Sequence, residues 1–361
     1  MRTDGQAEKF MRAALLEARK GLGQTSPNPA VGAVLVIRNR IVASGHHRGP
    51  GQPHAEVECL TRWKKEMPAD ATLFITLEPC STTGRTGPCT SAIIGSSVKN
   101  VVIGNIDVNP RHHGRGLKLL EKAGIKVRVG VLEEECKDLN EYFNKWIVTG
   151  LPFVIAKCGM SLDGHLRRSP GESQWLTSAG ARRHAHRLRA GVDAILVGAE
   201  TVRRDNPRLT VRGIPRSKQP LRIVLTRSGE LPSRGHLFED RFKDRTFVYR
   251  NNGLADVLAD LGKRDITSVL IEGGGKILGE ALDTGVIDKI QVYIAPLFTG
   301  GPVVAFGGQG CSSTGDATQV ERIAYERVGG DICVSGYVRD VPIRGQAKQT
   351  SNVQRRTPNV E

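Results

Sequence analysis

One histidine, one glutamate and two cysteines in the first third of the sequence have the types and spacing of a zinc site. His54 lies in the segment HAEVECL, Glu56 follows two residues later, and LEPCSTTGRTGPC contains Cys80 and Cys89. One imidazole and two thiolates are ligands that Zn²⁺ prefers, and three protein ligands leave a fourth position open for water. These residues therefore predict an open, reactive zinc centre.

An open zinc site generates hydroxide near neutral pH. Glu56 is too close in sequence to His54 to be needed as a ligand, but it can face the bound water. A carboxylate there can take the proton of the water and pass it to a substrate nitrogen. We therefore expect His54, Cys80 and Cys89 to bind zinc, and Glu56 to be catalytic in replacing an amine by hydroxide with loss of ammonia.

A proline directly precedes each of the three predicted ligands. The backbone before each ligand is therefore expected to be extended. Each ligand is then expected to begin a helix, whose N-terminus would stabilise a thiolate. A structural zinc module is the non-enzymatic alternative, but it would need a fourth Cys or His at ligand spacing, and the sequence has none there.

The hydrophobic pattern around these residues alternates between helix and strand. An apolar stripe at helical spacing runs from Phe10 to Ala18. Strands are expected at residues 30–37 and 41–45, as a hairpin, then at 71–77, at 98–104 and in the segment IKVRVG. This order predicts an α/β domain over residues 1–149, with helices on both faces of one sheet.

The pattern restarts near Gly150-Leu151-Pro152. Strands are expected in FVIAKCG, AILVG, LRIVLT, RTFVY, SVLIE and KIQVYIAP, with helical segments such as SAGARRHAHRLRAG between them. This predicts a second α/β domain over residues 150–340. Residues 341–361 are polar and have no apolar period, so they are expected to be a disordered tail.

Composition narrows the class of protein. The 361 residues are enough for two cores, and 39% hydrophobic with 25% charged residues is typical of a soluble globular protein. No apolar run reaches membrane-spanning length and the N-terminus is charged, so we expect a cytoplasmic protein without a membrane partner. The net charge of +15 indicates an anionic partner. Basic blocks with interleaved aromatics are missing, which favours a phosphorylated small molecule over nucleic acid.

Seven cysteines spread over a chain of this length do not form the pattern of a secreted disulfide framework. Cys59, Cys136, Cys158 and Cys333 lie in apolar stretches and are expected to pack in the cores. In the second domain, LIEGGGKILGEAL reads as a strand, a glycine loop and a helix start that could receive a phosphate. The arginines of RRHAHRLR could bind an anion or form a solvated face. His165, His184, His186 and His236 are expected to have surface or packing roles.

These motifs resemble the family of bifunctional riboflavin-biosynthesis deaminase-reductases. The zinc deaminase signature is H-x-E followed by P-C-x-x-C, and the wider cysteine spacing here is similar to that of this family. TSPNPAVGAV from Thr25 and D.NP…G.G from Asp107 also resemble it. The resemblance implies a cytidine-deaminase-like three-layer domain that removes an amine from a diamino-hydroxy-phosphoribosylamino-pyrimidine, with Asn28 helping to hold this phosphorylated substrate.

The segments KCGMSLDG, GESQWLTS, HRLRAGVDAILVG and IEGGG are similar to the reductase half of the same family. This implies a dihydrofolate-reductase-like domain that uses NADPH to reduce the ribosyl chain to ribityl, and a homo-oligomer. The residues similar to cofactor contacts are Gly159, Trp175, Thr201, Asp205 and the loop from Gly274. Those similar to substrate contacts are Ser173, Arg189, Leu209, Arg212 and Glu272, with Lys157 near the hydride-transfer position.

The sequence departs from the family pattern at two places. In the deaminase half, Thr82 replaces a histidine and Gly87 a proline. In the reductase half, Thr226-Arg227 replaces Asp-Ser, and Arg227 could contact or block the 2′-phosphate of NADPH. Two alternatives to the bifunctional enzyme remain open: a deaminase whose reductase half has lost turnover, and a nucleic-acid deaminase.

Overall fold

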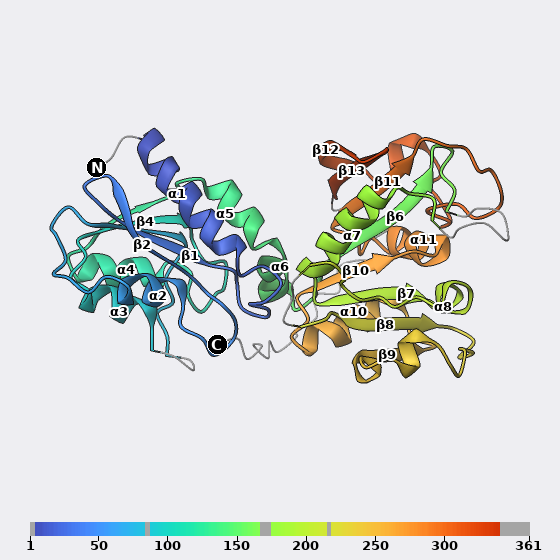
Figure 1. Cartoon of the computed structure of the whole chain (residues 1–361), viewed down its shortest axis with the longest axis horizontal. Coiled ribbons are helices and arrows are strands. Elements are labelled where there is room, and N and C mark those ends of the chain that lie inside the picture. The colour runs from blue at the N-terminus through green and yellow to red at the C-terminus, as the bar shows by residue number, and fades with distance from the viewer. Residues whose placement is uncertain (1–3, 84–86, 167–174, 215–217, 340–361) are drawn as a thin grey trace. The chain divides into compact units, whose positions relative to one another are not determined.

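The computed structural model describes residues 4–83, 87–166, 175–214 and 218–339. These residues form two compact units, one ending at Gly150 and the other beginning at Leu151 (Figure 1). Gly150 ends a helix in the left-handed conformation, at φ 74°. Within the described residues, we find no helix with the length and apolar character needed to span a membrane. The predicted tail, residues 341–361, lies outside the described residues.

The first unit is built on a five-stranded sheet in the order β2-β1-β3-β4-β5. The strands are β1 (Gly32–Ile37), β2 (Arg40–His46), β3 (Thr72–Leu77), β4 (Asn100–Asn105) and β5 (Lys126–Val129). β1 and β2 pair antiparallel, which confirms the predicted hairpin, whereas β3, β4 and β5 run parallel to one another.

Helices cover both faces of this sheet. They are α1 (Asp4–Arg19), α2 (Ala55–Thr61), α3 (Cys89–Gly95), α4 (Arg115–Lys122), α5 (Glu133–Leu139) and α6 (Glu141–Thr149). Successive strand residues point to opposite faces. Val34 and Phe74 therefore join a core with α1 and α5, while Leu35 joins a core with α2, α3 and α4. This confirms the three-layer prediction.

The second unit contains an eight-stranded sheet in the order β12-β13-β11-β6-β10-β7-β8-β9. The strands are β6 (Phe153–Ser161), β7 (Ala194–Gly198), β8 (Leu221–Thr226), β9 (Thr246–Arg250), β10 (Ser268–Glu272), β11 (Lys289–Ala295), β12 (Val320–Val328) and β13 (Asp331–Val338). β6 to β11 are parallel, and the central strands β7 and β10 are short apolar runs, as is usual for strands covered on both faces. All six were predicted.

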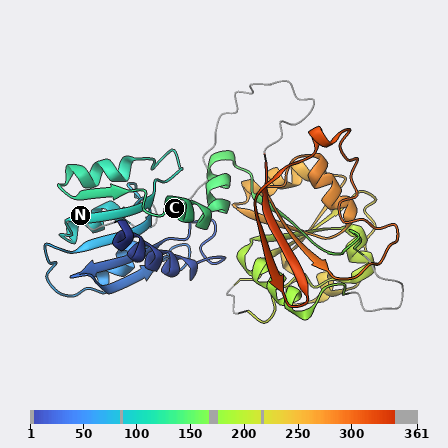
Figure 2. The same cartoon turned by 90° about the horizontal axis from the view of Figure 1, so that it is seen from above.

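The antiparallel hairpin of β12 and β13, coloured red in Figure 2, was not predicted from the sequence. Gly329 and Gly330 join its two strands. Most side chains of β12 are exposed, and the segment VERIAYERV alternates charged and apolar residues only loosely. Because the alternation of apolar and polar residues is weak on this exposed edge strand, the sequence does not indicate a strand there.

The helices and short 3₁₀ turns of the second unit connect its strands. They are α7 (Ala179–Gly191), α8 (Ala199–Asp205), α9 (His236–Glu239), α10 (Leu254–Lys263), α11 (Gly275–Asp283), η1 (Lys243–Arg245) and η2 (Thr314–Asp316). Because β7, β8 and β10 are parallel, their carboxyl ends meet at one edge of the sheet. The start of α8, the Thr226-Arg227 turn and the glycine loop before α11 follow these ends.

Candidate active sites

His54, Cys80 and Cys89 form a cluster in which the three ligand atoms lie within 4.8 Å of one another. His54 Nδ1 is 3.1 Å from Cys89 Sγ and 3.6 Å from Cys80 Sγ. Tetrahedral zinc with Zn–S of about 2.3 Å and Zn–N of about 2.0 Å requires ligand atoms about 3.5 to 3.8 Å apart. The Cys80 distance matches this spacing and the Cys89 distance is shorter by about 0.4 Å, so a small separation of His54 and Cys89 lets the three side chains hold one zinc ion, with Nδ1 as the histidine ligand.

Two helix starts and one strand end place these ligands. His54 is the N-cap of α2 in extended conformation, and Cys89 is the first residue of α3 after Pro88. Cys80 follows the end of β3 and is succeeded by irregular backbone over residues 81–83. The prediction that each ligand begins a helix is therefore wrong for Cys80, because its position comes from the strand rather than from a helix of its own.

The start of α3 nevertheless stabilises the Cys80 sulfur. The Cys89 side chain, the His54 ring and the Cys89 backbone N–H, which donates to Cys80 Sγ at 3.3 Å, lower the pKa of the Cys80 thiol to about 4 against the opposing effect of burial. A thiolate is the form that binds a metal. Cys80 is thus a thiolate at neutral pH and can bind a metal cation.

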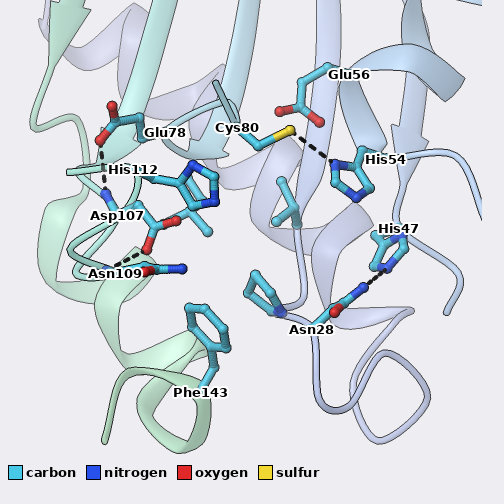
Figure 3. Close-up of a pocket in the computed structure, with 13 residues that line it drawn as sticks. Asn28, His47, His54, Glu56, Glu78, Cys80, Asp107, Asn109, His112 and Phe143 are labelled. Carbon is cyan, nitrogen blue, oxygen red and sulfur yellow. Dashed lines mark hydrogen bonds between the residues drawn. The ribbon is translucent and has the colours of Figure 1, made fainter. Parts of the chain in front are cut away.

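Glu56 lies in the first turn of α2 and is 3% exposed. Figure 3 shows its carboxylate beside Cys80 and above the pocket that His54 also lines. Burial raises the pKa of Glu56 to about 7, although the nearby His54 opposes this. A carboxyl group with a pKa in this range can both accept and return a proton at neutral pH.

Asn28 and His47 form one wall of this pocket. Asn28 Nδ2 donates to His47 Nε2 at 3.2 Å, and the other ring nitrogen, Nδ1, lies 3.2 Å from the carbonyl oxygen of Pro53. These contacts require a neutral ring that accepts at Nε2 and donates at Nδ1. Burial lowers the pKa of His47, in agreement with a neutral ring. The amide of Asn28 is thereby held in place at the pocket.

Glu78 fixes the opposite wall, the segment from Asp107 to Gly116. Its carboxylate accepts hydrogen bonds from the backbone N–H groups of Asp107 (3.2 Å), Gly114 (3.0 Å) and Gly116 (2.8 Å). A Cβ at residue 116 would lie 2.3 Å from the carbonyl oxygen of Pro79, so only glycine allows this approach. The close packing of this segment on Glu78 and Pro79 therefore explains why the motif D.NP…G.G ends in a glycine.

Several pocket residues were not predicted as site residues. These are His47, Glu78, Asp107, Asn109, His112 and Phe143. Glu78 lies directly before Pro79-Cys80, and this position in the sequence could have indicated that Glu78 belongs to the site. Thr82, which replaces the family's histidine, is exposed and is not among the described residues that line the pocket. The histidines that line it are His47, His54 and His112.

In the second unit, Arg189 of α7 and Glu272 at the end of β10 form a buried ion pair. Arg189 donates to both carboxylate oxygens at 2.6 and 2.5 Å, and its third nitrogen donates to the Thr210 carbonyl at 3.1 Å. Burial alone would raise the pKa of Glu272, but Arg189 and Lys157 lower it to about 2. The solvated-face alternative therefore does not hold for Arg189, whose donors face protein groups.

We expect this pair to show strong coupling in a double-mutant cycle. Removing one partner of a buried ion pair costs roughly 3 to 5 kcal/mol, because the other charge stays buried without compensation. Arg189→Met and Glu272→Gln should each lower the free energy of unfolding by this order. The double variant should lose clearly less than the sum, as measured by calorimetry of the full chain. Additive losses would contradict the coupling.

The charges of the predicted substrate residues Lys157, Arg189, Arg212 and Glu272 all act on one histidine, His186. Burial, and then the charges of Arg189 and Arg212, lower the pKa of His186 to about 4. Its Nδ1 accepts a hydrogen bond from the Arg212 backbone N–H at 3.3 Å. His186 was expected to have only a surface or packing role, and its lack of ligand spacing concealed this position.

Three other residues predicted for the reductase half differ in where they lie. Leu209 is buried and has a left-handed φ of 47°, next to the Thr210 carbonyl that Arg189 contacts. Ser173 lies outside the described residues. Trp175 is 45% exposed and carries the Arg182 guanidinium at 5.2 Å from its ring centre.

The residues predicted to contact the cofactor include a glycine loop suited to a phosphate. Gly273 and Gly274 have φ values of 86° and 75°, and the nine-residue helix α11 begins directly after them. A Cβ at Gly274 would lie 3.3 Å from Thr201 Oγ1, so these two predicted contacts are neighbours. No described atom lies within 4 Å of a Cβ built on Gly273. The loop therefore fits a phosphate group of NADPH.

The remaining predicted cofactor residues lie on separate elements. Gly159 is in β6, where a Cβ would lie 3.0 Å from Thr177 Cγ2, and Asp205 is the last residue of α8. Arg227 is exposed after β8 and forms an ion pair with Glu280 of α11 at 3.0 Å. Arg227 is thus held beside the helix that follows the glycine loop.

Two family models match this chain. Residues 4–105 match the model of the cytidine and deoxycytidylate deaminase zinc-binding region, and residues 152–334 match the RibD C-terminal domain. The first covers all three zinc-ligand candidates and Glu56. The second covers every residue that was predicted for the reductase half.

Full-length relatives match both halves together. The riboflavin biosynthesis protein RibD of Aquifex aeolicus is 38% identical, over 91% of this chain and 97% of its own, and that of Escherichia coli is 37% identical over 91% and 98%. Among solved structures, the diaminohydroxyphosphoribosylaminopyrimidine deaminase/5-amino-6-(5-phosphoribosylamino)uracil reductase of Thermotoga maritima has a TM-score of 0.85 at 35% identity, covering 93% of this chain and 99% of its own. RibD of Acinetobacter baumannii gives 0.85 at 32%, covering 94% and 100%.

Proposed function

The chain belongs to the RibD family of bifunctional riboflavin-biosynthesis enzymes, and from this premise we propose how its residues divide the two reactions. Residues 1–149 are the deaminase domain and residues 150–340 the reductase domain. The observation that carries the assignment is the cluster of His54, Cys80 and Cys89 beside the buried carboxyl of Glu56.

In the deaminase domain, His54, Cys80 and Cys89 hold the zinc ion, which supplies hydroxide at neutral pH when bound. Glu56 accepts a proton from the attacking water and returns it to the departing amine, so that ammonia leaves. Asn28, held by His47, binds the pyrimidine. The substrate that we propose is diaminohydroxyphosphoribosylaminopyrimidine, the substrate printed in the name of the Thermotoga relative.

In the reductase domain, NADPH supplies the hydride that converts the ribosyl chain to ribityl. Gly159, Trp175, Thr201, Asp205 and the loop from Gly274 bind NADPH. Lys157, Ser173, Arg189, Leu209, Arg212 and Glu272 bind the substrate. Arg212 provides positive charge for the ribose phosphate, and Lys157 polarises the sugar near the hydride-transfer position. Arg189 acts through Glu272, because its guanidinium is already engaged.

Two assays on the full chain test this function. We expect zinc-loaded protein to release ammonia from the diamino pyrimidine and then to oxidise NADPH, with one NADPH consumed for each ammonia released. Ammonia release without NADPH oxidation would favour the alternative of a deaminase with an inactive reductase half. Ammonia release from single-stranded nucleic acid instead would contradict the substrate.

We also propose that the chain forms a homo-oligomer in the cytoplasm. Ile323 and Tyr325 on the edge strand β12 are 46% and 72% exposed, and Ile332 on β13 is 49% exposed, so an apolar surface is available to a second copy. All seven cysteines are free, as in a reducing compartment. Analytical ultracentrifugation should give a mass of at least two chains of 39.2 kDa each. A monomer at micromolar concentration would contradict the proposal.

A further inference from the structure

The imidazole of His112 makes no hydrogen bond that would explain its position, within the part of the protein that the structure describes. It lines the deaminase pocket together with Asp107 and Asn109. Its Nδ1 is buried and has no hydrogen-bond partner among the described residues. Buried polar atoms are paired in nearly all native structures, because an unpaired one is destabilising. Because Nδ1 is shielded from solvent, Nε2 is the ring nitrogen that is left to meet a partner entering the pocket.

The backbone that carries His112 is firmly held. The backbone N–H of His112 donates to the Asn109 carbonyl at 2.9 Å, and Glu78 binds the same loop at Asp107, Gly114 and Gly116. Figure 3 shows Asp107, Asn109 and His112 on one side of the pocket, with Asn28, His47 and His54 on the other. The ring is therefore presented from a fixed wall toward the space where the pyrimidine must lie.

The neighbouring histidine shows that this arrangement is specific to residue 112. His113 is exposed, and its Nδ1 lies 2.9 Å from the Asp107 carbonyl oxygen, so its ring has a partner within the loop. Burial lowers the pKa of His112, so its ring is neutral and offers one donor and one acceptor. A pyrimidine with amine, carbonyl and ring-nitrogen groups can pair with Nε2, because it offers both donors and acceptors.

We propose that His112 binds the pyrimidine of the deaminase substrate by a hydrogen bond from its ring, opposite Asn28, and so positions the reacting carbon beside Glu56. This inference rests on the proposed function. It adds a substrate-binding residue in a pocket that has lost the family's histidine at residue 82, whose replacement Thr82 is exposed.

The test compares ammonia release by the full chain and by His112→Phe, which keeps a planar ring but removes both nitrogens. Loss of one hydrogen bond to the substrate should raise KM about tenfold, with kcat within about threefold of the parent. Zinc content, and NADPH oxidation with deaminated substrate, should not change. His112→Gln, which again offers a donor and an acceptor, should recover part of the lost affinity.

The matched control is His113→Phe, the same exchange one residue further on. Because the His113 ring pairs with the backbone of the loop, a general disturbance of the loop would appear in this variant as well. We expect its KM to stay within about threefold of the parent.

An unchanged KM in His112→Phe, or equal losses in both variants, would overturn the inference. Absence of ammonia release by the parent itself would instead refute the proposed function. If His112→Phe fails to bind zinc, the KM of His112→Ala decides, and a value equal to that of the parent would overturn the inference too.

Discussion

Glu56→Gln is expected to abolish ammonia release while zinc stays bound. Glutamine has nearly the same shape as glutamate but cannot accept a proton, and a positioned general base contributes about 10² to 10⁴ in rate. Because Glu56 is not one of the clustered ligands, the zinc content should remain at one ion for each chain. Steady-state ammonia release and metal analysis of the same preparation measure both quantities.

Glu58→Gln is the matched control for this variant. Glu58 lies on the same helix two residues later, but its carboxylate pairs with Arg48 at 2.7 Å and Arg62 at 2.6 Å outside the pocket. Surface ion pairs of this kind contribute about 0 to 1 kcal/mol. The control should therefore release ammonia at the parent's rate. Activity of Glu56→Gln above about a tenth of the parent would contradict the proton-transfer role.

Cys89→Ala is expected to lose both zinc and ammonia release. The variant leaves one imidazole and one thiolate, and it also removes the side chain that helps to lower the pKa of Cys80. Two ligands do not form the three-ligand site that catalytic zinc requires. The zinc content should fall below about a tenth of an ion for each chain, whereas NADPH oxidation with deaminated substrate should persist.

Cys59→Ala provides the control, because Cys59 is another buried thiol of the same unit, on α2, and lies outside the metal cluster. Burial raises the pKa of Cys59 to about 12, which is the state of a structural thiol rather than of a ligand. This control should keep its zinc and its activity. Chelation of the parent should reproduce the loss, and added zinc should reverse it. Zinc bound normally by Cys89→Ala would refute the ligand assignment.

The sequence was most informative where chemistry and local pattern agree. The H-x-E and two Pro-Cys segments predicted the ligands that the structure clusters, and short apolar runs predicted the parallel strands β6 to β11. In both cases the signal is local, since ligand types and strand patterns can be read within a few residues. The free thiols also behaved as expected: Cys59, Cys136, Cys158 and Cys333 are all buried.

The features that the sequence did not predict depend on contacts between distant segments. Glu78 contacts Gly116 across 38 positions, and Arg189 pairs with Glu272 across 83. His112 and His186 have no recognisable spacing, so only the folded chain shows that they face a pocket or a charged cluster. The helix expected after Cys80 was wrong because a proline before a ligand favours extended backbone at that point but does not determine the conformation of the residues after the ligand.

X-ray absorption at the zinc edge of the purified, zinc-loaded chain tests the central claim most directly. The assignment of His54, Cys80 and Cys89 as ligands predicts one zinc ion for each chain, with two sulfur ligands at about 2.3 Å, one imidazole nitrogen at about 2.0 Å and one further light atom. A spectrum with four protein ligands, with any number of sulfurs other than two, or with no bound zinc would contradict it.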